Sequence, residues 1–119
     1  MKLIERAKSH FESLGVQSIK IEEWTDEHGK PSIIYWNPIT LSEKNKLFKS
    51  SNNLNDVSIL ADVVIMKAID KEGKKLFSID DKIIIMNKVD SDVLSKIATS
   101  MVQSISPDEV KKNSEKTQN

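Results

Sequence analysis

The sequence contains no cysteine, three glycines, three prolines and, among 18 basic residues, a single arginine, Arg6. Without cysteine the chain has neither disulfides nor thiol chemistry, which fits an intracellular protein. Three glycines are too few for either glycine-rich phosphate-binding loop. The planar fork of arginine is preferred for reading base edges and phosphates. A chain with one arginine is therefore a poor candidate for such recognition.

Long hydrophobic runs are also absent. No apolar run exceeds about five residues, whereas a helix that spans a bilayer needs about 20. Residues 1–15 carry charges throughout and lack the apolar centre of a signal peptide. The 18 basic and 18 acidic residues cancel, so no net field attracts nucleic acid or an anionic membrane. We therefore expect a soluble intracellular protein that binds neither membranes nor nucleic acid.

The first third of the chain predicts a helix followed by a β-hairpin. Apolar residues recur at helical spacing up to Leu14, and Gly15 is suited to end that helix. Strand-like alternation then begins, interrupted by turn residues at 26–31 and resumed by a β-branched and aromatic run that ends at Trp36. A hairpin alone is marginal in water, so it must pack on helices.

The remainder of the chain predicts four helices packed as a small bundle, which makes the fold α+β but mainly α. Capping pairs mark two of the helix starts, Thr40 with Glu43 and Ser78 with Asp81. Aliphatic residues nearly vanish near the end of the chain. We expect one globular domain over 1–106 (1–15 helix, 16–36 hairpin, 41–106 helical part) and a disordered, flexible tail over 107–119.

The stretch from Asp56 to Asp81 is the predicted centre of the fold. Its first part is apolar on one helical face, formed by Val57, Leu60, Ala61, Val64, Ile65 and Ala68. Further apolar residues, up to Ile69, cover the other sides of the same helix, and the next helix has four in succession over 83–86. One small chain cannot easily cover both helices on every side. The surplus is either core or a surface for other proteins, and the pattern leaves both interpretations open.

Residues with catalytic or metal-binding chemistry form no recognisable motif. His10 and His28 lack a second ligand at metal-binding spacing, and the acidic residues do not match a calcium loop. The serine motifs of hydrolases are absent. Trp24, Tyr35 and Trp36 could stack bases, but strand packing is the simpler interpretation. We expect no enzyme activity, no cofactor and no metal.

Three motifs follow one another in the helical part. They are Pro-x-Thr-Leu-x-Glu-Lys at 38–44, Asp-x-x-Gly-x-x-Leu-Phe at 70–77 and Asp-x-x-Val-Leu-x-x-Ile-Ala at 90–98. In this order, from about Ile19 to Ile105, the chain resembles the tail assembly chaperones of long-tailed phages and prophages. The resemblance does not extend to the first helix.

The resemblance implies a non-catalytic assembly factor in the bacterial host cytoplasm that is absent from the mature virion. Such chaperones bind the tape measure protein, keep it soluble, help to recruit the major tail tube protein and tend to self-associate. Many are also made in a longer form by a programmed frameshift, for which the codons of Lys111, Lys112 and Asn113 are compatible with an A-rich slippery run.

A surface for such partners is predicted on the surplus apolar side chains, with methionine favoured for adaptable contacts. The candidates for partner binding or self-association are Val63, Met66, Ile69, Ile85 and Met86. The alternative function is a small phage-encoded nucleic-acid-binding or regulatory protein, which would need a basic face assembled from scattered lysines.

Overall fold

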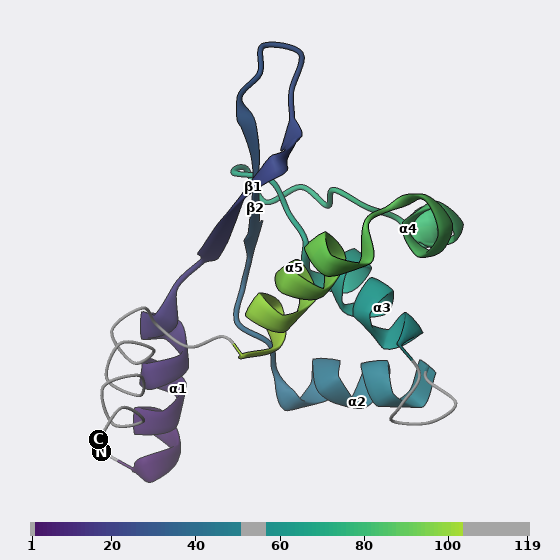
Figure 1. Cartoon of the computed structure of the whole chain (residues 1–119). Coiled ribbons are helices and arrows are strands. Elements are labelled where there is room, and N and C mark those ends of the chain that lie inside the picture. The colour runs from purple at the N-terminus through teal and green to yellow at the C-terminus, as the bar shows by residue number, and fades with distance from the viewer. Residues whose placement is uncertain (1, 51–56, 104–119) are drawn as a thin grey trace, which may run out of the picture.

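The computed structural model describes residues 2–50 and 57–103 (Figure 1). Its elements are α1 (Leu3–Leu14), β1 (Gln17–Thr25), β2 (Pro31–Trp36), α2 (Leu41–Ser50), α3 (Ser58–Lys67), a 3-10 turn (Ile79–Asp81), α4 (Lys82–Lys88) and α5 (Ser91–Gln103). The predicted fold class, mainly α with one hairpin, is confirmed. Predictions that concern 51–56 and 104–119, among them a cap at Asn55 or Asp56 and the flexible tail, lie outside the described residues.

Helix α3 is the centre of the fold, with α2, α4 and α5 packed against it. Because α3 is apolar on nearly every side, it is buried on nearly every side, including Val63 and Val64. The hairpin adds Ile21, Ile34 and Trp36 to the same core, and α5 adds the stripe Val93, Leu94, Ile97, Ala98 and Met101. The prediction for Val57 is wrong: it is 70% exposed because it stands at the N-cap of α3, before the helix itself begins.

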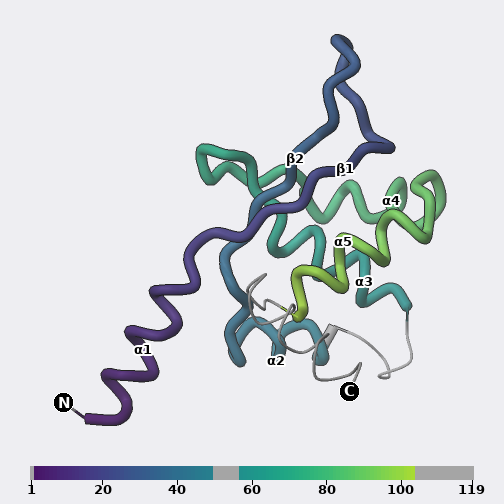
Figure 2. The backbone as a smooth tube through the Cα atoms, turned by 60° about the vertical axis from the view of Figure 1, so that its left-hand side comes forward, coloured from purple at the N-terminus to yellow at the C-terminus, as the bar shows by residue number. Residues whose placement is uncertain are grey.

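Helix α1 has the predicted bounds but contributes nothing to the core. None of its residues is buried, and the views in Figures 1 and 2 both show it projecting from the start of β1, away from the other helices. Its apolar side chains remain in solvent, with Leu3 77% and Ile4 72% exposed. The described part of the chain thus contains an amphipathic helix whose apolar stripe is uncovered.

The hairpin is joined by a turn that occurs twice in this chain. In Asp26–Lys30 and again in Asp70–Lys74, the aspartate N–H donates to the carbonyl of the lysine four residues later at 2.8 Å. The aspartate Oδ1 also accepts two further backbone N–H groups in each turn. Both turns place glycine at positive φ, +79° at Gly29 and +89° at Gly73. The shared Asp-x-x-Gly-Lys sequence therefore produces the same local structure at two sites.

The second turn is attached to the sheet, which corrects the prediction for Ile69. The apolar pattern placed Ile69 on the central helix, but α3 ends at Lys67 and Ile69 is extended. Its N–H donates to the Tyr35 carbonyl at 2.8 Å, and Tyr35 N–H donates back to Ile69 at 3.0 Å. The free edge of β2 thus hydrogen-bonds the backbone N–H and C=O groups of Ile69. In a longer α3 these groups would have bonded within the helix. Lys75 Nζ binds the freed Met66 carbonyl at 3.0 Å.

The repeated turn allows a matched test of glycine at positive φ. We expect Gly73→Ala and Gly29→Ala each to lower the free energy of unfolding by about 1 kcal/mol, because an L-residue is strained in this region. No atom lies within 4 Å of the position of the added Cβ in either turn, so backbone strain alone should act. Urea unfolding measures the effect, with Lys71→Ala in the second turn as a near-neutral control. Equal stability of all four proteins would contradict the prediction.

Candidate protein-binding site

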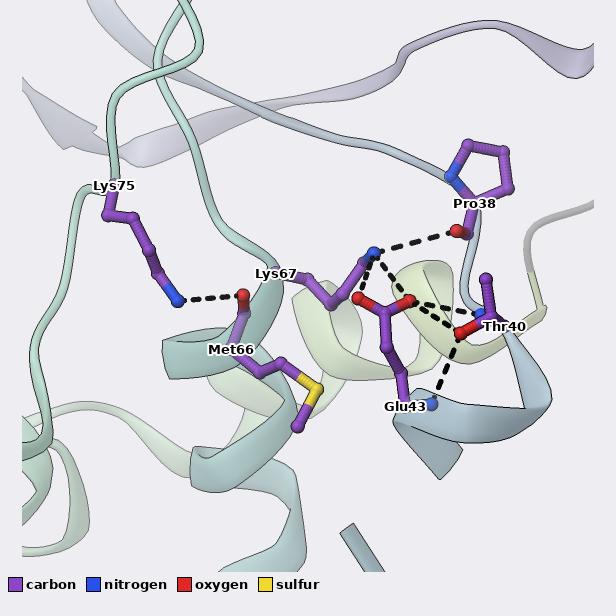
Figure 3. Close-up of polar contacts among 6 residues, drawn as sticks. All are labelled: Pro38, Thr40, Glu43, Met66, Lys67 and Lys75. Atoms are coloured by element: carbon purple, nitrogen blue, oxygen red, sulfur yellow. Dashed lines mark hydrogen bonds and ion pairs between the residues drawn. The ribbon is translucent and has the colours of Figure 1, made fainter. Parts of the chain in front are cut away.

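A buried ion pair joins α2 to α3. Lys67 at the end of α3 is only 7% exposed, and its Nζ donates to both carboxylate oxygens of Glu43 at 2.9 Å and 3.0 Å (Figure 3). The Pro38 carbonyl lies 3.5 Å from the same nitrogen. A buried ammonium group must be paired, so this contact constrains how α2 can lie on α3. Sequence patterns identified Lys67 only as a polar interruption of an apolar helix.

Glu43 also forms the predicted capping box at the start of α2. Thr40 N–H donates to Glu43 Oε1 at 3.0 Å, and Glu43 N–H donates to Thr40 Oγ1 at 3.1 Å. Partial burial by itself would raise the pKa of Glu43. Hydrogen bonds from Lys67 and from Thr40 outweigh burial and hold this pKa below its ordinary value of 4.5. One carboxylate therefore both begins α2 and fastens it to the core.

Beside this ion pair lies an apolar depression of about 260 Å³, which we call the α2–α3 groove. Its lining consists of Ile39, Lys44, Leu47, Phe48, Ile59, Leu60, Val63 and Val102. Leu47 and Val63 are buried at its base, whereas Phe48 is 52% and Val102 41% exposed. Lys46 and Lys49, both exposed, lie on the same helix as Lys44. Of these three lysines, Lys44 alone lines the groove, which thus combines an apolar interior with one basic side chain.

A second apolar depression, of about 130 Å³, lies where α3, α4 and α5 meet, and we call it the α4–α5 groove. It is lined by Val57, Leu60, Ile85, Met86, Val89, Ser91, Leu94 and Ser95. Next to it, α4 presents Ile83, 75% exposed, and Ile84, 56% exposed. Lys82 ties α4 to α3 by donating to Asp62 at 2.9 Å. This short helix therefore buries Ile85 and leaves its other isoleucines in solvent.

The five predicted contact residues do not form one surface. Val63 is 1% and Ile85 4% exposed, so the expectation that they are surface residues is corrected: they are core side chains that line different grooves. Met86 is 43% exposed beside the α4–α5 groove. Met66 and Ile69 are half-buried, near the end of α3 and beside β2. Other elements cover α3 on almost every side. Its apolar residues beyond a single helical face therefore belong to the core and are not free to bind a partner.

The sequence drew attention to the apolar run over 83–86, but the predicted contact residues included none of the exposed side chains at or beside the grooves, Phe48, Val102, Ile83 and Ile84. A signal existed at Leu47 and Phe48, since two adjacent large apolar residues on a helix point about 100° apart and cannot share one narrow buried stripe. One of these two side chains must therefore lie near the surface. Which one depends on how α2 is rotated on α3, and the Lys67–Glu43 pair contributes to that choice.

A third depression, of about 620 Å³, lies between β1 and α5 and is polar, lined by Glu23, Trp24, Asp90, Asp92, Val93 and Lys96. Lys96 Nζ donates to both oxygens of Glu23 at 3.2 Å. Hydrogen bonds from its own backbone N–H and then from Lys96 lower the pKa of Glu23. Within residues 2–50 and 57–103 no three acidic, histidine or cysteine side chains are grouped to hold a metal ion. This depression thus offers an ion pair rather than a metal centre.

The two histidines and the three large aromatic side chains of the hairpin are not brought together. His10 lies on α1 and His28 in the hairpin turn. Trp36 is 3% exposed and belongs to the core, whereas Trp24 and Tyr35 are half-buried. These rings therefore do not make an exposed stacking platform. None of the described helices is both long enough and apolar enough to cross a membrane.

Comparison of the chain with protein-family models, with curated proteins and with solved structures gives no match.

The ion pair can be tested with a substitution that keeps the capping box. Glu43→Gln preserves an acceptor for Thr40 N–H but leaves Lys67 buried without a countercharge, so we expect the free energy of unfolding to fall by about 1–3 kcal/mol. Lys67→Met should change it by less than about 1 kcal/mol, because Glu43 can be hydrated. Urea unfolding measures both. Glu12→Gln, which removes an exposed pair on α1, is the control. Equal losses in Glu43→Gln and Glu12→Gln would contradict a buried role.

The lowered pKa of Glu43 predicts a dependence of stability on pH. A carboxyl group whose pKa is lower in the folded than in the unfolded chain adds stability that is complete above its ordinary value of 4.5 and is lost as the pH falls through the folded pKa. Unfolding midpoints in urea should therefore decline below that pH. In Glu43→Gln the decline should be shallower. Parallel curves for the two proteins would show that Glu43 is not responsible.

Proposed function

We propose that this protein is a non-catalytic tail assembly chaperone of a long-tailed phage or prophage. It binds the tape measure protein in the bacterial host cytoplasm, keeps it soluble, promotes polymerisation of the major tail tube protein and leaves before the virion is mature. The three motifs between 38 and 98 support this proposal. The observation that carries it is the α2–α3 groove, an apolar depression whose rim side chains stand in solvent.

The first motif is built into this groove. Of residues 38–44, Ile39 and Lys44 line the groove, while Thr40 and Glu43 form the capping box that begins α2. Glu43 also holds Lys67 under the same helix. A local sequence that begins α2, fastens it and lines the depression is suited to maintaining a binding site.

The groove has the chemistry expected for an amphipathic helix. The proposed client is long and helical and has an apolar face that would aggregate if it stayed in water. An apolar stripe laid along the groove would bury its side chains against the interior and pack beside Phe48, as in other helix-in-groove contacts. Lys44, which lines the groove, would favour an acidic residue beside that stripe and would help to orient the helix. The contact needs no catalytic group.

Co-expression with the tape measure protein of the same phage or prophage tests the function. We expect the tape measure protein to be soluble with the wild-type chaperone and to remain with it on purification. Phe48→Glu should reduce the soluble fraction at least several-fold, since a charge at the groove rim opposes apolar contact. Lys44→Glu should weaken retention by reversing the rim charge. Soluble yield and co-elution are the measurements.

The matched control is Ile33→Glu, which introduces the same charge at a 45% exposed apolar position on β2, away from both grooves. It should leave the tape measure protein soluble. Circular dichroism and thermal unfolding establish that every variant is folded. A tape measure protein that is equally soluble without the chaperone would overturn the proposal. So would full activity of Phe48→Glu and Lys44→Glu together.

A further inference from the structure

The described part of the chain ends at the rim of the α2–α3 groove. Helix α5 is described as far as Gln103, and Val102, one residue earlier, lines the groove and is 41% exposed. In both Figure 1 and Figure 2 the end of α5 lies close to α2. The chain therefore continues into residues 104–119 from the edge of this apolar depression.

The sequence beyond Gln103 has an apolar side chain within reach of the groove. Ile105 and Val110 are the only aliphatic residues in 104–119. Ile105 follows Val102 by three residues, and three residues span at most about 10 Å. A tether this short makes docking an intramolecular step, with an effective concentration on the order of millimolar. Covalent geometry thus holds Ile105 near the groove.

The groove has room for this side chain. Its volume is about 260 Å³, whereas a protein cavity of about 150 Å³ accepts benzene, which is comparable in size to the side chain of isoleucine. Leu47 and Val63 at its base offer aliphatic contacts. Placing Ile105 beside Phe48 and Val102 would remove exposed apolar surface of all three side chains from water.

The charges that follow Ile105 complement the groove. Lys44 is the only charged residue among the described residues that line it. The first two charged residues after Gln103 are both acidic, Asp108 and Glu109. They follow Ile105 by three and four residues, a span of at most about 14 Å. Both carboxylates can therefore reach Lys44 from an Ile105 that occupies the groove, and this complementarity favours one orientation.

We infer that Ile105 docks into the α2–α3 groove of its own chain, with Asp108 and Glu109 beside Lys44. The consequence of this contact rests on the proposed function, because the docked segment and a client helix compete for one site. A client binds only those molecules whose groove is open, so its apparent Kd is the intrinsic Kd divided by the open fraction. The contact thus restrains client binding and shields the groove in a chaperone without a client.

Methyl NMR of the full chain tests the contact without a client. We expect nuclear Overhauser effects between the δ1 methyl group of Ile105 and methyl groups of Leu47 and Val63, which are distant from it in sequence. In a sample that mixes labelled and unlabelled chains, these effects should arise within one chain. Their absence would overturn the inference. Effects that arise only between chains would also overturn it and would show a second copy in the groove.

Two matched variants of the full chain test the role of Ile105. Ile105→Asp should shift the amide signals of Lys44 and Leu47 and leave that of Ile33, on β2, unchanged. Val110→Asp places the same charge further along the same segment and should leave all three signals in place. Circular dichroism verifies that both variants are folded. Equal shifts of the Lys44 and Leu47 signals in the two variants would contradict the inference.

Co-expression with a limiting amount of chaperone tests the competition. Ile105→Asp should retain several-fold more tape measure protein than the wild type, since its groove is open in every molecule, and Val110→Asp should match the wild type. Unchanged retention in Ile105→Asp would overturn the competition. Methyl contacts without any client binding would refute the proposed function alone. Client binding without methyl contacts would refute the inference alone.

Discussion

The contact between Lys67 and Glu43 is the constraint on which the arrangement of the helices depends. Apolar packing is non-directional, so a helix such as α3, apolar on nearly every side, accepts neighbours in several rotations at similar free energy. A buried ammonium group removes that freedom, because it must find a carboxylate at hydrogen-bonding distance. Glu43 meets this need from the first turn of α2. That pairing contributes to the rotation of α2 that leaves Phe48 partly exposed and buries Leu47.

The resulting molecule divides its apolar surface between two places. One is the α2–α3 groove, beside the ion pair and along a helix that carries lysines. The other is the α4–α5 groove, next to the exposed isoleucines Ile83 and Ile84 of α4. The first groove has a lysine, Lys44, in its lining, whereas the lining of the second contains no charged residue among those that the structure describes.

Local elements of the fold were predictable because their causes lie within a few residues. The capping box at Thr40 and Glu43 begins α2 at Leu41, and Gly15 ends α1 at Leu14, as predicted. The two Asp-x-x-Gly-Lys turns form through hydrogen bonds that span at most four residues. Three predictions for single residues that depended on distant neighbours were wrong. Ile69 left the helix for the edge of β2, and Val63 and Ile85 were covered rather than exposed.

The sequence alone therefore determined the order of the elements, most of their ends, the mainly helical class and the presence of more apolar surface than one helix face requires. Only the tertiary structure decided where that surplus lies. Exposure of a side chain is set by elements that are distant in sequence: Lys67 and Glu43 are 24 residues apart, and Tyr35 and Ile69 are further apart still. Hydrogen bonds within a turn need only their own residues, whereas a groove exists only after several helices have packed.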